Sequence, residues 1–488
     1  MGKMITFMVL FAVIFIVSPA VLAQNGLSPL EELGKFLYFD ENLSTPPGQS
    51  CATCHAPEVG FTGPISQINN ETSVYPGAVF TRFGNRKPPT AAYGGESPIF
   101  HYDDTEELFL GGMFWDGRAT GWELGDPLAE QARGPFLNPL EMNNPNKQSV
   151  CIKVAFSEYA GLFKAVWGDP PMFKKKDDIE RTYDRIALSI AAFEASAEVN
   201  PFTSKFDYYL KGEATLTQQE ELGMNLFMDE EEGGGRCALC HVPPLFTDFS
   251  YDNLGIPKFP GNPFYTMPPK WNPAGEDWID PGLGGFLKSA GYSEEVYNAE
   301  WGKHKVPTLR NVDKRPYPLF VKAYGHNGYF KSLEEITHFY NTRDVQGEGW
   351  PAPEVPATVN TDELGDLGLT TAEEMAIVAF MKTLSDGYDP SNSMAMSQPK
   401  SGAAGLKVAG PNPFNPETNF LYTVSAPGNV KIEVFNITGQ RMATLVNDWK
   451  PAGDYPLKWY AAQYPSGIYF IRLNTNHEVL VKKVSLIK

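Results

Sequence analysis

The sequence predicts a mostly α fold built from two similar units in tandem, followed by a small all-β sandwich. A helix-like segment that leads into a Cys-x-x-Cys-His motif occurs twice, which indicates an internal duplication. The C-terminal end instead alternates apolar and polar residues between Pro, Gly and Asn turns, as strands do. We therefore expect helical domains at residues 24–212 and 213–385, a linker at residues 386–404 and the sandwich at residues 405–488.

The chain begins with the pattern of a secretory signal peptide at residues 1–23. Lys3 gives the positive start, Ile5–Val17 the apolar run, and Val21-Leu22-Ala23 a small-residue cleavage site. The apolar run is too short to span a bilayer, so we expect no transmembrane segment. The formal net charge of −18 over 488 residues argues against nucleic acid and against an anionic membrane surface as partners.

The first duplicated helix is expected from Ser28 to Asp40, because Ser is a good cap and Pro and acids follow in the first turn. The same plan returns at Glu220–Asp229, where Leu222-Gly223 matches Leu33-Gly34. Apolar residues at helical spacing predict further helices, and many Gly and Pro predict one long irregular stretch lying over a cofactor. These helices are expected at residues 182–197, 333–340 and 371–384, and the irregular stretch at residues 246–303.

The sandwich is expected from short alternating runs broken by turn residues. These strands are expected at residues 419–423, 430–436, 455–460 and 468–473. The C-terminal end has no His/Cys cluster and no pair of acids in a plausible site, so we expect it to be non-catalytic.

Cys51-Ala52-Thr53-Cys54-His55 and Cys237-Ala238-Leu239-Cys240-His241 have the attachment signature of c-type haem. The two thiols bond the haem vinyl groups and the imidazole becomes the proximal iron ligand. A thioredoxin-like redox pair or half of a zinc site is the alternative for each motif alone. The His in the fifth place of both copies favours two covalently bound haem c groups, in two cytochrome c-like domains with His55 and His241 on the iron.

The fifth cysteine, Cys151, lies in an apolar run and has no partner thiol left. We expect a buried structural cysteine, with a reactive thiol as the alternative.

Several motifs, in order, closely resemble bacterial di-haem cytochrome c peroxidases and the related MauG-type enzymes. The resemblance covers Ser28–Leu384. It is carried by Phe114–Ala119, Glu130–Ala132, Gly134–Met142, Lys305–Val312, Gly325–Gly328 and Ser332–Glu335.

The resemblance implies that the first haem is the peroxidatic one and that its open face is served by Gln131, Pro135 and Glu141. Cleavage of peroxide needs a group that takes a proton from one oxygen and gives it to the other. A carboxylate in a partly apolar pocket can do so, and Glu141 is our candidate, with Gln131 as a hydrogen-bonding helper. A solvated surface acid is the alternative for Glu141. Trp115 matches the family tryptophan between the haems and would relay electrons, the alternative being an ordinary core Trp.

The resemblance also bears on the sixth ligand of the second haem, fourteen residues after His326. This ligand is Met in typical peroxidases and Tyr in the MauG type, and here the position is Tyr340. A phenolate would lower the haem potential, whereas Met raises it. His338 is the competing ligand, on another face of the helix. A Tyr340 packed without an iron bond is the remaining alternative.

The open face of the first haem has no obvious resting ligand. Relatives that need reductive activation carry a His where this chain has Glu71, so we expect a five-coordinate or water-bound iron. His101 could reach the iron, but a hydrogen-bonded loop His is the favoured interpretation. Many relatives bind calcium through an Asn where this chain has Lys87, and a charged Lys cannot ligate calcium, which argues against calcium here. His304 and His477 receive only an ordinary structural interpretation.

The C-terminal end resembles the Ig-like sorting domains of type IX secretion substrates. The resemblance implies passage through the outer membrane to the cell surface. A periplasmic location is the alternative for the protein, and a spacer or adhesion module is the alternative for this domain. It is carried by Asn412–Thr418, Phe435–Gln440 and Ser466–Phe470.

Together these patterns predict an exported di-haem peroxidase that reduces hydrogen peroxide to water. Its electrons would come from a small donor protein, a c-type cytochrome or a cupredoxin, and pass from the second haem to the first through Trp115. A MauG-like oxidase acting on a protein side chain is one alternative, favoured by Tyr340. A non-catalytic electron-transfer cytochrome is the other.

Overall fold

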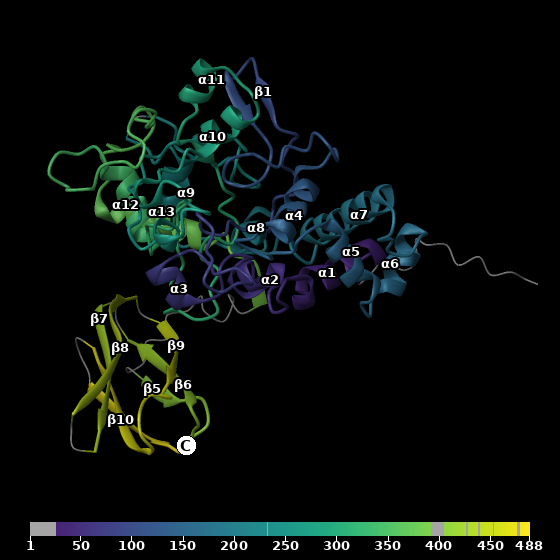
Figure 1. Ribbon diagram of the computed structural model, residues 1–488. Coiled ribbons are helices and arrows are strands. Elements are labelled where there is room, and N and C mark those ends of the chain that lie inside the picture. The colour runs from purple at the N-terminus through teal and green to yellow at the C-terminus, as the bar shows by residue number, and fades with distance from the viewer. Residues whose placement is uncertain are drawn as a thin grey trace, which may run out of the picture. The chain divides into compact units, whose positions relative to one another are not determined.

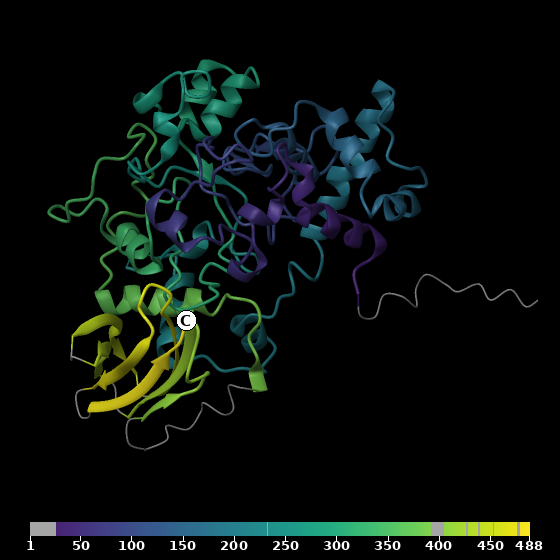
Figure 2. The ribbon, with the colours of Figure 1, turned by 60° about the horizontal axis from the view of Figure 1, so that its bottom comes forward.

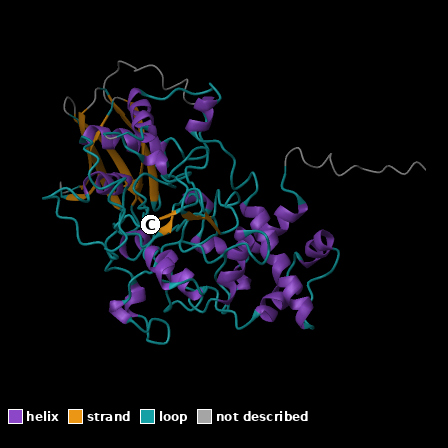
Figure 3. Cartoon of the chain, turned by 90° about the horizontal axis from the view of Figure 1, so that it is seen from above, coloured by secondary structure: helices purple, strands orange, loops and turns teal. Residues whose placement is uncertain are grey.

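The computed structural model describes residues 26–231, 233–391, 405–425, 428–437, 440–451, 453–475 and 479–488. The chain divides into two compact units, unit 1, Met1–Tyr388, and unit 2, Asp389–Lys488. The predicted mostly α fold with an all-β C-terminal end is confirmed (Figures 1 and 3). The expected signal peptide lies outside the described residues, as does most of the expected linker. Within the described ranges, no helix has both the length and the apolar character needed to cross a membrane.

Unit 1 is built from short helices joined by long loops, which Figure 3 shows threading between them. Its α-helices are α1 (Pro29–Phe39), α2 (Cys51–Cys54), α3 (Ser66–Glu71), α4 (Pro127–Leu137), α5 (Lys147–Ala155), α6 (Ala160–Trp167), α7 (Lys176–Glu194), α8 (Lys205–Leu210), α9 (Gln218–Met228), α10 (Gly282–Ser289), α11 (Glu294–Ala299), α12 (Leu333–Thr342) and α13 (Thr371–Lys382). Its 3-10 turns are η2 (Glu41–Leu43), η3 (Pro57–Val59), η4 (Cys237–Leu239), η5 (Pro263–Thr266) and η6 (Gly275–Asp277), and its strands are β1 (His101–Asp103), β2 (Leu108–Leu110), β3 (Tyr251–Asp252) and β4 (His304–Lys305).

The duplication is visible in how two helix pairs pack. Helix α1 packs on α7, and α9 packs on α13 in the same way. A Cβ added to Gly34 would lie 1.8 Å from the Ser189 carbonyl oxygen, and one added to Gly223 would lie 1.8 Å from that of Ala376. The glycine of the Leu-Gly pair is therefore needed for packing in both copies. Only glycine lets α1 approach α7, and α9 approach α13, so closely.

Each of these pairs belongs to its own apolar core. One core includes Leu37, Ile186 and Phe193, all at most 1% exposed. The other includes Phe227 and Phe380, both fully buried. Aromatic edge-to-face contacts, such as the one between Phe227 and Phe380 with ring centroids 5.2 Å apart, fix the second core.

The stretch 246–303, expected to be irregular, is so only in part. It contains β3, two 3-10 turns, and the helices α10 and α11, which pack on each other. The glycines that suggested a loop are needed inside α10, because a Cβ on Gly284 would lie 2.4 Å from the Tyr297 carbonyl oxygen of α11. Here glycine marks close helix packing instead of a helix break.

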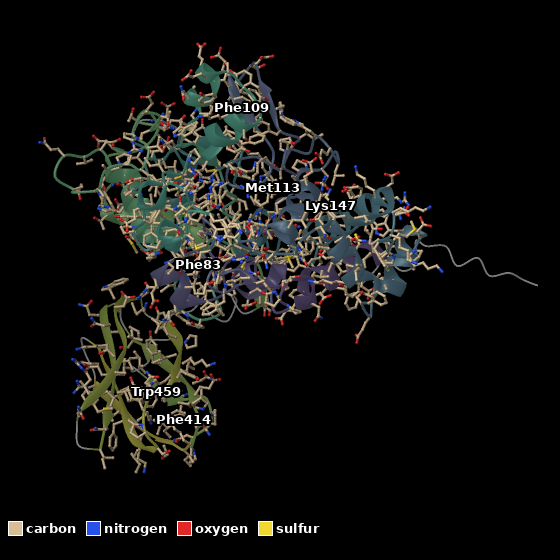
Figure 4. The ribbon with its side chains drawn as sticks, viewed as in Figure 1. Phe83, Phe109, Met113, Lys147, Phe414 and Trp459 are labelled. Atoms are coloured by element: carbon tan, nitrogen blue, oxygen red, sulfur yellow. The ribbon has the colours of Figure 1, made fainter. Side chains whose placement is uncertain are left out.

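Unit 2 is a sandwich of two antiparallel sheets, seen from below in Figure 2. One sheet has the order β11-β10-β7-β8 and the other β5-β6-β9. Phe414 and Trp459, both labelled in Figure 4, pack on each other inside it. Their ring centroids lie 5.3 Å apart. The strands are β5 (Gly405–Val408), β6 (Glu417–Val424), β7 (Gly428–Asn436), β8 (Arg441–Lys450), β9 (Gly453–Tyr460), β10 (Gly467–Asn474) and β11 (Val479–Leu486).

In unit 2, the three strands that the sequence did not predict, β5, β8 and β11, all lie at sheet edges. Edge strands carry charges that discourage pairing with other chains, and these charges obscure the alternating pattern. Lys482 and Lys483 do so in β11, and two register shifts interrupt the pairing of β8 with β7. The alternation of apolar and polar residues predicted only the four strands that are central or strongly apolar, β6, β7, β9 and β10.

Candidate active site

The first Cys-x-x-Cys-His motif opens onto a cavity in unit 1. Cys51, Cys54 and His55 line it, and it holds about 1240 Å³ of space between atoms, its open mouth included. His55 Nδ1 lies 2.9 Å from the Pro89 carbonyl oxygen, which can only accept, so Nδ1 donates and Nε2 is left unprotonated. Burial lowers the pKa of His55 to about 4, which keeps the imidazole neutral and able to bind a metal.

Three predicted residues reach this cavity from one helix and the loop after it. Gln131 and Pro135 lie on α4, and Glu141 follows in the loop; all three line the cavity with the two cysteines. Pro135 has no N–H to give to the carbonyl of Gln131, four residues earlier, so the α4 hydrogen-bond ladder is interrupted at that turn. The Met142 amide then donates to the Pro135 carbonyl at 3.1 Å, which folds the loop carrying Glu141 back onto the helix.

Glu141 is held in place and electrostatically perturbed. Asn138 Nδ2 donates to Glu141 Oε1 at 3.0 Å. Burial raises the pKa of Glu141 above its ordinary value, while the positive charge of Arg118 and the Asn138 hydrogen bond lower it by less. The net effect is a carboxyl group that is easier to protonate than a surface Glu, as proton transfer near neutral pH requires.

Sequence reasoning missed Glu194, which also lines the first cavity. Glu194 is 4% exposed, and its Oε2 has no hydrogen-bond partner among the described residues. Burial, and then the charge of Asp126, raise the pKa of Glu194 to about 8. A signal existed in the sequence, because Glu194 follows Ile190 by four positions and so falls on the apolar face of α7.

The second motif opens onto another cavity. Cys237, Cys240 and His241 line it, and it holds about 1660 Å³ of space between atoms, its mouth included. His241 Nδ1 lies 3.0 Å from the Phe246 carbonyl oxygen and donates to it, so Nε2 is again left to bind a metal. Burial lowers the pKa of His241 as well.

Tyr340 of α12 also lines the second cavity. Among the described residues its hydroxyl has no hydrogen-bond partner, and burial raises its pKa, followed in size by the charges of Cys240 and Cys237. His338 does not line this cavity. The His338 side chain is 42% exposed. Its Nδ1 lies 2.9 Å from Glu374 Oε1, and its Nε2 lies 3.6 Å from Glu348 Oε2. Tyr340, and not His338, therefore lies on the wall of the second cavity.

Trp115 lines both cavities and is 7% exposed. Its indole Nε1 donates to the Lys87 carbonyl at 2.8 Å, and its own carbonyl accepts from the Lys305 amide at 2.9 Å. The Lys87 side chain lies on the same wall, with Nζ 5.8 Å from the indole centroid. Met113, labelled in Figure 4, lines the first cavity beside this wall.

The residues of both cavities fit a covalently bound haem. Each has two thiols and a neutral imidazole whose Nδ1 is held by a backbone carbonyl, the usual arrangement for a metal-binding His.

Some predicted candidates lie away from the cavities. Glu71 is exposed at the end of α3 and accepts from Gln67 Nε2 at 3.1 Å. His101 is exposed on β1 and donates from Nδ1 to the Ile99 carbonyl at 2.8 Å. Cys151 is fully buried, with its pKa raised to about 12 chiefly by burial, as a structural cysteine should be. His477 lies outside the described residues.

The family model for di-haem cytochrome c peroxidase matches residues 28–215 of this chain. The model for a secretion system C-terminal sorting domain matches residues 411–488.

Relatives of known name are similar over most of unit 1. The methylamine utilization protein MauG of Paracoccus denitrificans is 33% identical over 389 residues, which is 75% of this chain and 92% of that protein. The cytochrome c551 peroxidase of Nitrosomonas europaea is 30% identical, over 75% of this chain and 82% of that protein. The crystal structure of the diheme peroxidase BthA from Burkholderia thailandensis superposes with a TM-score of 0.62 at 30% sequence identity. The superposition covers 76% of this chain and 89% of the BthA chain.

Proposed function

This chain is an oxidoreductase that belongs to the di-haem cytochrome c peroxidase and MauG family, and from this premise we propose that it is an exported peroxidase that reduces hydrogen peroxide to water. Two haem c groups would be bound covalently, one by Cys51, Cys54 and His55 and the other by Cys237, Cys240 and His241. When bound, the haem iron would supply the site at which peroxide binds and through which electrons are delivered.

Glu141 moves the proton. It takes a proton from the oxygen of peroxide that stays and returns it to the oxygen that leaves, so that the leaving group departs as water instead of hydroxide. Its raised pKa serves both halves of this cycle, because the carboxyl must accept and then release one proton. Gln131 offers its amide to the bound peroxide, and Pro135 fixes the turn from which both residues reach the cavity.

Trp115 carries electrons between the two cavities. Reduction of one peroxide to two waters takes two protons and two electrons, and the electrons would come from an external donor by way of the second haem. The indole belongs to the walls of both cavities and is anchored at Nε1 and at its own carbonyl, which supports this path. The donor we expect is a small c-type cytochrome or a cupredoxin.

The type IX sorting domain at the C-terminus implies export and a place at the cell surface. We infer that the N-terminal signal peptide provides the first step of that route.

The observation that carries the proposed function is that Glu141, Gln131 and Pro135 share one cavity with the first haem motif. The test is peroxide-dependent oxidation of a reduced c-type cytochrome by the holoprotein, followed optically. Glu141→Gln should lower kcat/KM by about 10²–10⁴-fold at unchanged haem content. The matched control Glu71→Gln, an exposed carboxyl, should keep wild-type turnover. Undiminished turnover in Glu141→Gln would refute the mechanism, and absence of turnover in the wild type would leave the electron-transfer cytochrome.

A MauG-like oxidase acting on a protein side chain is the second candidate. The observation that favours it is the position of Tyr340 in the second cavity, because an axial phenolate stabilises a higher oxidation state of iron than Met does. Mass spectrometry of candidate protein substrates after peroxide addition separates the two functions. Oxidation of a protein side chain with little turnover of the reduced cytochrome would favour the oxidase.

A further inference from the structure

Glu194 is a buried carboxyl group that the proposed proton transfer by Glu141 does not use. It is 4% exposed, lines the first cavity together with Cys51 and Glu141, and leaves its Oε2 without a hydrogen-bond partner among the described residues. Buried polar groups are almost always paired. The unpaired oxygen therefore has to be explained by what the cavity binds.

The two acids of this cavity have different surroundings. Burial raises the pKa of Glu141, and the charge of Arg118 and a hydrogen bond from Asn138 offset part of that rise. Glu194 has no such compensation, because burial comes first and the charge of Asp126 second, and both raise its pKa, to about 8. Near neutral pH, a change of one charge in the cavity is therefore enough to change the protonation of Glu194.

The helices packed against α7, which are α1, α4 and α5, bring no positive charge to Glu194. Helix α4 presents the carboxylate of Asp126 at its N-cap. Helix α1 presents Tyr38, whose pKa is raised by burial and then by the charge of Glu194. The basic side chains of these helices have other partners: Lys35 pairs with Glu198, Arg133 with Glu123 and Asp184, and Lys147 with Glu180, while Lys153 donates to Asn144.

The charge of Glu194 interacts with the first haem motif. Burial raises the pKa of Cys51, and the charge of Glu194 is the second cause of that rise. A haem bound at this motif loses one positive charge whenever an electron enters it. A buried carboxyl group in the same cavity then holds its proton more tightly in the reduced state than in the oxidised state.

We propose that Glu194 binds the proton that accompanies reduction of the first haem. When one electron arrives from the external donor, the Glu194 carboxylate takes one proton from solvent, and it releases the proton when the electron leaves. The charge of the cavity is then the same before and after reduction. Glu194 thereby sets the potential of this haem, whereas Glu141 passes protons to and from peroxide. The proposal rests on the proposed function only for the haem at the first motif and does not require peroxide turnover.

The test is a redox titration of the intact holoprotein at a series of pH values, without peroxide. EPR follows the two haems separately, and the second haem is the internal reference. The potential of the first haem should fall as pH rises, by at most about 59 mV for each tenfold fall in proton concentration. Glu194→Gln should remove this fall. The matched control Glu198→Gln, an exposed carboxyl paired with Lys35, should retain it.

Asp126→Asn gives a second and independent measurement. Asp126 Oδ1 accepts from the Leu128 amide at 2.8 Å as the N-cap of α4, and Asn caps helices as well as Asp does. The helix therefore stays and only the charge is lost. Because that charge helps to raise the pKa of Glu194, the fall in potential should move to lower pH in Asp126→Asn. This variant remains informative if Glu194→Gln fails to fold.

Redox-difference infrared spectra show the proton directly. The band of a protonated carboxyl group should appear on reduction of the wild type and be absent in Glu194→Gln. Circular dichroism and the haem absorption spectrum check folding. The proposal is overturned if the wild-type potential does not change with pH, or if folded Glu194→Gln changes with pH as the wild type does. Failure of the proposed function gives a different result, which is a pH-dependent potential without peroxide turnover.

Discussion

Replacing Glu141 by Gln is the sharpest probe of the first cavity. Gln keeps the shape of the side chain and can still accept the hydrogen bond from Asn138 Nδ2, which is 3.0 Å long. It cannot accept a proton at any accessible pH. The packing therefore stays and only the proton transfer is lost.

The loss of activity expected for Glu141→Gln follows from the proposed role of Glu141 in proton transfer. Positioned acid–base groups contribute about 10²–10⁴-fold to rate, which corresponds to about 2.7–5.4 kcal/mol of transition-state free energy. Because Glu141 acts before the peroxide bond breaks, we expect the fall in kcat and in kcat/KM alike, with haem content and spectra unchanged.

The pH dependence gives a second readout with a definite sign. Glu141 must be deprotonated to accept the proton, so kcat/KM should rise as pH rises through its pKa. Burial raises this pKa, and the acid limb should therefore lie above the value of an ordinary Glu. Removing the opposing charge in Arg118→Gln should move the limb to still higher pH.

Stopped-flow measurement of peroxide reduction between about pH 4 and about pH 9, which spans the ordinary carboxyl and histidine ranges, checks both statements. Glu141→Gln should lack the acid limb, and Glu71→Gln should retain it. An acid limb that survives unchanged in Glu141→Gln would show that another group takes the proton, with Glu194 the first to examine, since it lines the same cavity.

Three further substitutions, one of them with a matched control variant, test other parts of unit 1. Tyr340→Phe should abolish a low-spin EPR signal of the second haem at equal haem content; if the signal persists, Tyr340 is not the ligand. Gly34→Ala should cost about 1–3 kcal/mol in chemical denaturation, because its Cβ would lie 1.8 Å from the Ser189 oxygen, whereas Gly161→Ala, with nothing within 4 Å in α6, should be neutral or stabilising. Glu194 has a raised pKa of about 8, so the stability it contributes is complete below an ordinary Glu pKa and is lost as pH rises through 8. Glu194→Gln should flatten that decline, which is at most about 1.4 kcal/mol per pH unit, and an unchanged pH profile would contradict the assignment.

The parts of this fold that the sequence predicted are the ones encoded locally. A Cys-x-x-Cys-His motif, and the Leu-Gly pair of α1 or α9, can each be recognised from a few consecutive residues. The matching contacts of Gly34 with Ser189 and of Gly223 with Ala376 show that the repeated Leu-Gly pair reflected repeated packing. The family motifs placed Trp115 at a wall between two cavities, which periodicity alone could not have done.

The parts that the sequence could not predict depend on long-range convergence. His304, for which we expected an ordinary structural role, stacks on His326, and His326 in turn faces the carboxylate of Glu354. No local pattern relates these positions, because loops bring them together. Glu194 was missed for a different reason: acids on the apolar face of a helix are rare, so the face was defined from its apolar members alone.

The wall between the cavities carries a positive charge that the chain supplies itself. Lys87 Nζ lies 5.8 Å from the centroid of the Trp115 ring and donates to the Pro88 carbonyl at 3.1 Å. Burial, and then the charge of Lys331, lower the pKa of Lys87 to about 8, so the ammonium is mostly charged at neutral pH. A cation over an indole stabilises the electron-rich ring and therefore opposes a positive hole on it. Electron transfer through Trp115 should accordingly become easier as pH rises through 8, where Lys87 loses its charge and the opposition ends.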